Sequence, residues 1–230
     1  MEMNSREQIK SGEPFGLTTV DLGLSVKWAN ANLGATAPED YGDYYAWGET
    51  ETKENYSWKT YKWCAGTLDS LTKYNPWEPR TVAKEFVSYG TVDNKYTLEE
   101  TDDAAHVRLG GKWRMPTDAE WTELRTKCTW AWSNLNGVNG FKVVGPNGNH
   151  IFLPAAGLRE NAELKCSGSD GIYWSSEIDW VPRLSVGSPI MVWCLNCSEW
   201  NRGSGKELVY PVRRRYYRRH YGIPVRPVSE

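Results

Sequence analysis

The chain has 230 residues, enough for one domain with a substantial core, and a net charge of −2. A chain this close to neutral is not built as a whole to bind polyanions. Its 13 Trp and 13 Tyr against 4 Phe favour aromatic rings that carry a polar group, which suit turn-rich cores and binding surfaces.

Five cysteines at irregular spacings do not form the even set of a disulfide framework. They fit a reducing compartment, or a virion assembled in one. The first residues lack the apolar core of a signal peptide, and no segment approaches the 18 apolar residues of a membrane span. We therefore expect no signal peptide in the sequence as given and no membrane segment.

The first third of the chain predicts short strands and long loops. Residues 1–16 are polar and are expected to be a lead-in or tether. Residues 18–33 alternate apolar and polar side chains, which predicts a strand or hairpin with a bend at Gly23. Residues 37–42 predict a single helical turn. The polar stretch near 50–97 predicts an insertion held by scattered aromatic residues.

The clearest helix is expected over about 118–127. Thr117 is a good N-cap, and Glu120 three residues later completes a capping box. A shorter helix is expected to begin at Thr101. Farther on, Asn147-Gly148 lies between two apolar runs, 140–144 and 151–154, and predicts a β-hairpin.

Six ordered motifs carry a resemblance to a known family. They occupy residues 20–28, 41–49, 111–121, 152–157, 173–176 and 222–228. Together they resemble the Fibrobacter succinogenes major paralogous domain family, which is common in Bacteroides-type bacteria and their phages. The resemblance covers roughly residues 20–228. The residues Arg114 to Trp121 are also similar to a motif of the formylglycine-generating enzymes.

This resemblance implies an α+β, C-type lectin-like fold over 17–230: a small twisted antiparallel sheet, two short helices and long loops. Core positions are then expected for five tryptophans: Trp28, Trp47, Trp113, Trp121 and Trp174. In related variable proteins, a retroelement rewrites the C-terminal stretch at adenine-containing codons, typically those of asparagine. The corresponding variable region here is near 177–223.

The block 213–221 contains only Arg, Tyr and His, and all three can arise when the adenines of an Asn codon are replaced. Tryptophan cannot arise in this way, so Trp180, Trp193 and Trp200 are framework residues or lie outside the rewritten codons. Arginine and tyrosine are also the residues that dominate protein-binding surfaces.

The expected surface comprises residues near 177–185, 196–206 and 210–223, and its partner is an unknown protein or surface ligand. The ligand-binding candidates are Asp179, Trp180, Arg183, Asn196, Arg213, Arg214, Arg215, Tyr216, Tyr217, Arg218, His220 and Tyr221. One alternative is a solvated face beside an acidic surface of the same domain. Another is binding of single-stranded nucleic acid or another polyanion through the Arg/Tyr block.

Metal binding and catalysis are not expected. If residues 192–197 form a strand, Cys194 and Cys197 point to opposite faces and cannot share an ion. The alternative of an oxidase of the formylglycine-generating type requires a late cysteine, whereas no cysteine follows Cys197. The sugar-binding calcium motifs of C-type lectins also do not occur. The sequence thus predicts a non-catalytic binding protein without a cofactor, on a phage tail or a cell surface.

Overall fold

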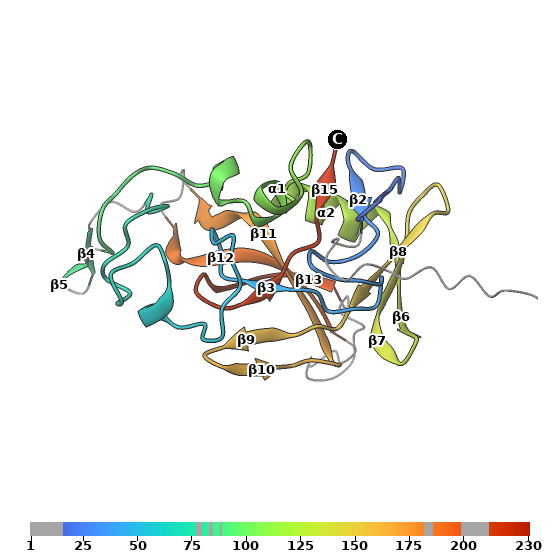
Figure 1. Ribbon diagram of the computed structural model, residues 1–230. Helices are drawn as coiled ribbons and strands as arrows, with labels where there is room; N and C mark the ends of the chain where they lie inside the picture. Colours follow the sequence, from blue (N-terminus) through green and yellow to red (C-terminus); the bar gives the residue numbers. More distant parts are fainter. Residues whose placement is uncertain (1–15, 77–79, 83–84, 88, 182–185, 199–211) are drawn as a thin grey trace, which may run out of the picture.

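The computed structural model describes residues 16–76, 80–82, 85–87, 89–181, 186–198 and 212–230. The protein is α+β and mainly β, with small antiparallel sheets and few helices (Figure 1). This agrees with the predicted fold class at that level. Most of the predicted lead-in, the candidate Arg183 and much of the predicted 196–206 surface lie outside the described residues.

Most of the elements are short. The strands are β1 (Thr19–Val20), β2 (Lys27–Ala29), β3 (Tyr44–Tyr45), β4 (Arg80–Val82), β5 (Glu85–Val87), β6 (Thr129–Leu135), β7 (Val138–Val144), β8 (His150–Pro154), β9 (Leu158–Glu160), β10 (Glu163–Lys165), β11 (Asp170–Val181), β12 (Val186–Ser198), β13 (Val212–Arg218), β14 (Ile223–Pro224) and β15 (Val228–Ser229). The helices are α1 (Ala104–Leu109) and α2 (Asp118–Lys127), with 3-10 turns η1 (Trp58–Thr60) and η2 (Glu100–Asp102).

The central sheet consists of β11, β12 and β13, all antiparallel, with β12 in the middle. Successive residues of a strand point to opposite faces, and both faces of this sheet are packed. Trp174 and Cys194 belong to one buried cluster, whereas Tyr173, Leu195 and Cys197 belong to another. The prediction that Cys194 and Cys197 point to opposite faces is confirmed. The sheet therefore separates two cores.

The two ends of the described chain meet beside these cores. β2 lies between β1 and β15, with Trp28 opposite Val228, and β3 pairs with β14. The predicted hairpin of residues 18–33 is confirmed, and its bend uses Gly23 at a φ of 74°. Arg226 is fully buried and donates hydrogen bonds to the carbonyl oxygens of Ala29 and Phe152 at 3.1 and 2.7 Å.

Helix α2 has the predicted bounds and the predicted cap. The Thr117 hydroxyl accepts from the Glu120 backbone N–H at 3.2 Å, and the Glu120 carboxylate accepts from the Thr117 N–H at 2.8 Å. Arg114 donates two bonds to Glu120, at 2.9 and 2.6 Å. The buried Trp121 donates its indole N–H to the carbonyl oxygen of Trp174, which lies in β11, at 3.0 Å. The motif at 114–121 therefore fixes α2 against the central sheet.

Replacing the cap should destabilise the fold measurably. We expect Thr117→Ala to lower the free energy of unfolding by about 1 kcal/mol, because the Glu120 N–H loses its acceptor. Urea unfolding measures the change. Thr126→Ala is the matched control, since Thr126 is exposed in the same helix and its hydroxyl bonds only to carbonyls one turn earlier. Equal losses in the two variants would contradict the capping role.

Two local predictions were wrong. The short helix near 101–106 does not begin at Thr101: η2 precedes it, and Asp103 is the N-cap of α1. The Asp103 carboxylate accepts from the N–H groups of Ala105 and His106, a contact that the Thr101 position cannot make. Residues 37–42 form turns instead of a helical turn: the Asp40 N–H donates to the carbonyl oxygen of Ala37 at 3.1 Å, and the Asp40 carboxylate accepts from the N–H and hydroxyl of Thr36.

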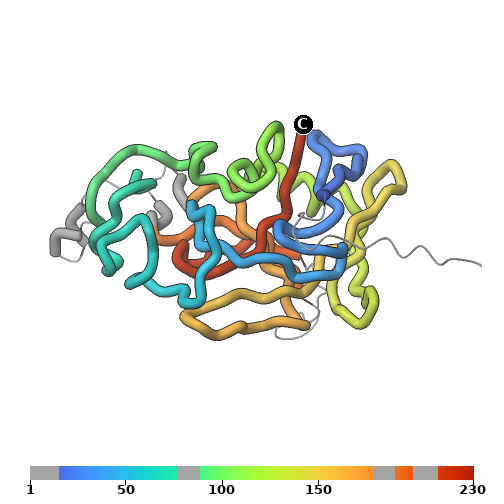
Figure 2. Tube along the Cα trace, in the orientation of Figure 1, coloured from blue at the N-terminus to red at the C-terminus, as the bar shows by residue number. Residues whose placement is uncertain are grey.

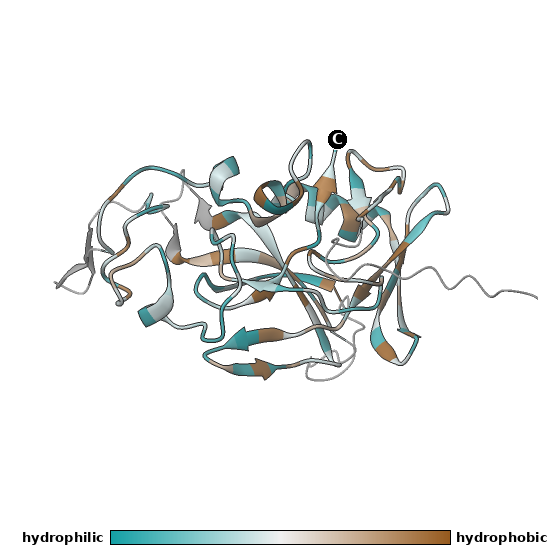
Figure 3. Ribbon diagram, viewed as in Figure 1, coloured by the Kyte–Doolittle hydropathy of each residue, from teal (hydrophilic) through white to brown (hydrophobic). Residues whose placement is uncertain are grey.

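The predicted hairpin around Asn147-Gly148 is confirmed as β7 and β8, and β6 extends it to three strands. Four of the five expected core tryptophans are fully or almost fully buried: Trp28, Trp47, Trp121 and Trp174. Trp113 is only partly buried, because it lies in the connection between α1 and α2. Figure 3 shows apolar residues spread over many short elements. In the described part of the chain, no helix is long and apolar enough to cross a membrane.

The described residues of 50–97 occupy one end of the molecule (Figure 2). Aromatic hydroxyls attach this stretch to the segment around β3: Tyr56 donates to the carbonyl oxygen of Tyr44 at 2.5 Å, and Tyr61 donates to that of Trp47 at 2.7 Å. Its last residue, Thr97, forms an isolated β-bridge with Glu177 of β11, and the N–H of the next residue, Leu98, donates to the carbonyl oxygen of Ser176. The stretch is thus attached both to the segment around β3 and to β11.

Candidate ligand-binding surface

Strand β13 is the centre of the candidate surface. It pairs with β12 without interruption, from Val212 opposite Cys197 to Arg218 opposite Met191. Val212 and Arg219, which bound the paired segment, are 3% and 0% exposed. Between these two anchors, Arg214, Arg215, Tyr216 and Arg218 are exposed. The backbone of the strand is thus fixed while these side chains reach solvent.

Alternation along β13 divides its side chains between the two faces of the sheet. Arg214, Tyr216 and Arg218 share the face that α2 partly covers, together with Trp193 of β12. Arg213, Arg215 and Tyr217 lie on the other face, where Tyr217 packs against the buried cluster around Trp174. The predicted Arg/Tyr block therefore presents two differently composed faces.

Three side chains on the α2 face form a contact cluster. The Arg214 guanidinium lies 3.4 Å from the ring centroid of Trp193, and the Trp193 and Tyr216 centroids are 5.8 Å apart. Arg214 Nε also donates to Asp118 Oδ1 at 2.6 Å, in the first turn of α2. Tyr216 remains 55% exposed. A cation held between an aromatic ring and a carboxylate has a defined position, which suits recognition.

Two predicted ligand-binding residues are buried. Asn196 is 6% exposed, because it lies in the middle strand between Ile172 and Arg213, on the same side as Val192 and Cys194. His220 is 4% exposed, because its ring packs against Trp58 and Tyr221 with centroids 4.4 and 4.7 Å away. The expectation that these two side chains face outward is wrong.

Tyr217 and Tyr221 are partly buried rather than freely exposed. Burial raises the pKa of Tyr217, the neighbour of the Trp174 cluster. The Tyr221 hydroxyl donates to Glu160 at 2.8 Å, and burial raises its pKa as well. Both hydroxyls are therefore neutral near pH 7, and Tyr221 acts first as a link between the end of β13 and β9.

Asp179 and Trp180 lie in the last part of β11, and Trp180 pairs with Gly187. The last paired residue of β13, Arg218, is opposite Met191. The register between β11 and β12 shifts between Ile178, which is opposite Val192, and Trp180. The described pairing therefore places the backbone of Trp180 past the last paired residue of β13.

Arg219 is a structural residue that sequence reasoning did not separate from its neighbours. Its Nε donates to the Tyr61 hydroxyl at 2.7 Å, and its other nitrogens donate to the carbonyl oxygens of Tyr74 and Lys73 at 3.0 and 3.1 Å. Its guanidinium also lies 5.0 Å from the Trp47 ring centroid. Arg219 thus joins the end of β13 to the stretch 50–97.

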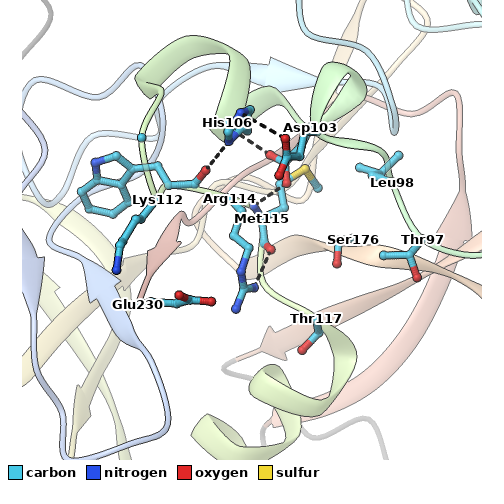
Figure 4. A pocket seen from close by; sticks show the side chains of 13 residues that line it. Thr97, Leu98, Asp103, His106, Lys112, Arg114, Met115, Thr117, Ser176 and Glu230 are labelled. Carbon is cyan, nitrogen blue, oxygen red and sulfur yellow. Dashed lines mark hydrogen bonds and ion pairs between the residues drawn. The ribbon is translucent and has the colours of Figure 1, made fainter.

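A cavity of about 360 Å³ lies between α1, the loop before α2 and β11 (Figure 4). Asp103, His106 and Arg114 line it, but their polar atoms have structural partners. Asp103 accepts from three backbone N–H groups, including that of Met115 at 2.8 Å, and burial raises its pKa. Nδ1 of His106 lies 3.2 Å from the carbonyl oxygen of Trp113. These contacts assign the polar groups to the support of α1 and the α2 cap.

Cys194 and Cys197 are not arranged as a reactive pair. Cys194 and Cys197 are buried on opposite faces of β12, and burial raises the pKa of each. Burial also raises the pKa of Cys128 to about 11. Reactive thiols have lowered pKa values, so these three side chains have the character of structural cysteines. Among the described residues, no group of three or more His, Cys, Asp or Glu side chains is placed to hold a metal ion.

Comparison of the chain with protein-family models, with curated proteins and with solved structures gives no match in any of the three. What indicates a function is therefore the geometry of β13 and of the residues that surround it.

Proposed function

We propose that this protein is a non-catalytic ligand-binding protein with a C-type lectin-like fold, displayed on a phage tail or a cell surface. Its partner contacts are made by the exposed side chains of β13, and a retroelement diversifies these side chains. The observation that carries the proposal is the exposure of Arg214, Arg215, Tyr216 and Arg218 between the buried anchors Val212 and Arg219. Such positions can change without repacking a core.

The arrangement also narrows the segment that diversification would rewrite. Replacing Arg219 would remove three hydrogen bonds, and replacing His220 would disturb a packed aromatic group. Both residues are reachable from an Asn codon, but their burial makes most replacements costly. We therefore place the changeable positions at 213–218. The fixed neighbours Trp193 and Asp118 provide a constant base beneath them.

Such a surface binds favourably because its backbone is pre-organised. β13 is bonded to the middle strand of a sheet with packed faces, so its backbone is ordered before a ligand arrives. Arginine and tyrosine then supply a large contact area, and the entropy cost of ordering the strand is not incurred on binding. The buried Cys194 and Cys197 and the partly buried Cys128 support the non-catalytic part of the proposal, because burial raises the pKa of each thiol.

The proposal predicts that the exposed positions tolerate replacement. We expect the triple variant Arg215→Ser, Tyr216→Ser, Arg218→Ser to change the free energy of unfolding by about 1 kcal/mol or less, because the three side chains are exposed. Urea unfolding at neutral pH measures this change. Val212→Ser is the matched control at the buried end of the strand, with an expected loss of about 2 kcal/mol or more. A loss in the triple variant as large as in the control would contradict the tolerance.

Sequencing the DNA around the gene tests the function itself. We expect a reverse-transcriptase gene and a near-copy of the 3′ end of this gene. The two copies should differ mainly in codons 213–218, at positions where the near-copy has adenine. Relatives should vary at these codons and keep codons 219 and 220. If sequencing finds neither the reverse transcriptase nor the near-copy, and relatives vary no more at 213–218 than elsewhere, the proposal fails.

A further inference from the structure

Strand β13 is an edge of the central sheet in the described part of the chain. The sheet order is β11, β12, β13, and β12 pairs with both of the others. No strand among the described residues pairs with the outer side of β13. Side chains on both of its faces are exposed, Arg215 on one and Tyr216 on the other.

The register identifies which backbone groups point outward. The Arg219 N–H donates to the carbonyl oxygen of Ile190 at 3.0 Å, in the same register that places Arg218 opposite Met191. Hydrogen-bonded and non-bonded positions alternate in an antiparallel pair. Counting back from Arg219, residues 217, 215 and 213 bond to β12. Arg214 and Tyr216 therefore direct their N–H and C=O groups away from the sheet.

Charge selects the kind of segment that this edge can accept. Four arginines, Arg213, Arg214, Arg215 and Arg218, lie within one seven-residue strand. Pairing with a second copy of β13 would place like charges side by side, which is a common protection against self-association of edge strands. An acidic segment meets the opposite situation, because its carboxylates would lie beside arginines on both faces.

We propose that the outer edge of β13 binds an extended acidic polypeptide segment as an additional strand. The segment's backbone bonds to the outward N–H and C=O groups of Arg214 and Tyr216, and its carboxylates pair with the flanking arginines. Trp193 and Tyr216 supply apolar contact on the α2 face. This inference rests on the proposed ligand-binding function and names the class of ligand for this variant of the surface.

Backbone pairing distinguishes this ligand from other polyanions. A single-stranded nucleic acid would use the arginines and the aromatic rings, but it has no amide groups to pair with the edge. An acidic polypeptide gains from both the charges and the amides. Loss of the ligand's amide N–H groups therefore separates strand addition from attraction between charges alone.

The experiment uses the full chain and a decapeptide of alternating glutamate and threonine, with blocked ends. Isothermal titration calorimetry compares it with the same peptide carrying N-methyl groups on its four central residues, with a lysine-threonine decapeptide and with a thymidine oligonucleotide. We expect the acidic peptide to bind, its N-methylated form to bind about tenfold or more weakly, and the basic peptide not to bind. The oligonucleotide should bind more weakly than the acidic peptide.

A protein-side variant repeats the test on β13. Tyr216→Pro removes the outward N–H, whereas Tyr216→Ala removes the ring and keeps the N–H. We expect the proline variant to bind the acidic peptide at least about fivefold more weakly than the alanine variant. Circular dichroism and thermal unfolding show whether both are folded. If the proline variant is not folded, the comparison of the acidic peptide with its N-methylated form on the unmodified chain decides whether the ligand adds as a strand.

The inference is overturned if the acidic peptide does not bind, or if the N-methylated peptide or the oligonucleotide binds equally well. Equal binding of the N-methylated peptide leaves a ligand-binding surface that attracts acidic chains by charge. The absence of a retroelement beside the gene would overturn the diversification proposal and leave the strand addition intact. The two proposals therefore fail on different results.

Discussion

Arg219→Ala is expected to lower the free energy of unfolding by about 3 to 5 kcal/mol. The substitution leaves the buried carbonyl oxygen of Tyr74 and the partly buried one of Lys73 without their arginine donor and deprives the Tyr61 hydroxyl of a partner. It also opens a void beside the Trp47 ring. The effect should be visible as a lower urea midpoint and as faster proteolysis within the described part of 50–97, which Arg219 holds to the sheet.

The adjacent residue provides the control. Arg218 is the same amino acid in the same block, but it is exposed, so Arg218→Ala should change the free energy of unfolding by about 0.5 kcal/mol or less. Arg219→Lys should recover only part of the loss, because an ammonium group cannot reproduce the fork that reaches three acceptors. Equal stability of the alanine variants at 218 and 219 would refute the anchor role.

Local signals made α2 and the β7–β8 hairpin predictable. The Thr117 and Glu120 pair specifies a helix start through contacts within four residues of the chain, and Asn147-Gly148 specifies a tight turn in the same way. The short helix α1 shows the limit of such signals. Thr101 and Asp103 are both good caps, and the contact that favours Asp103 comes from the N–H of Met115, twelve residues later.

The candidate surface was predictable as a region but not residue by residue. Arg218 and Arg219 are identical in type, and their opposite environments depend on residues 61–74, which no local pattern connects to β13. For Asn196 the sequence did contain a signal of burial. Asn196 continues the alternation of Val192 and Cys194 along β12, and it therefore lies on their buried face. Applying the period of the strand to that polar residue would have predicted its burial.

His220 gives the second large effect, which is a dependence of stability on pH. Burial, with a contribution from the nearby Arg218, lowers the pKa of His220 from 6.5 to about 4. Its Nδ1 has no hydrogen-bond partner in the described part of the chain, so a proton there would gain no acceptor. The folded protein thus holds the neutral ring, whereas the unfolded chain binds a proton below pH 6.5.

The sign follows from proton linkage. Between pH 6.5 and about 4 the unfolded state binds more protons, so the stability contributed by the neutral ring is complete above pH 6.5 and declines as the pH falls. The decline through this window should reach about 3 kcal/mol. Carboxylates titrate in part of the same range, so the measurement is the difference between the wild type and His220→Gln in urea unfolding at a series of pH values.

We expect the wild type to lose more stability than His220→Gln as the pH falls from 6.5 to about 4, with the two profiles parallel above that window. His150→Gln is the matched control, because His150 is exposed at the start of β8, and its profile should follow that of the wild type. Parallel profiles of the wild type and His220→Gln throughout the range would show that the ring accepts its proton in the folded state.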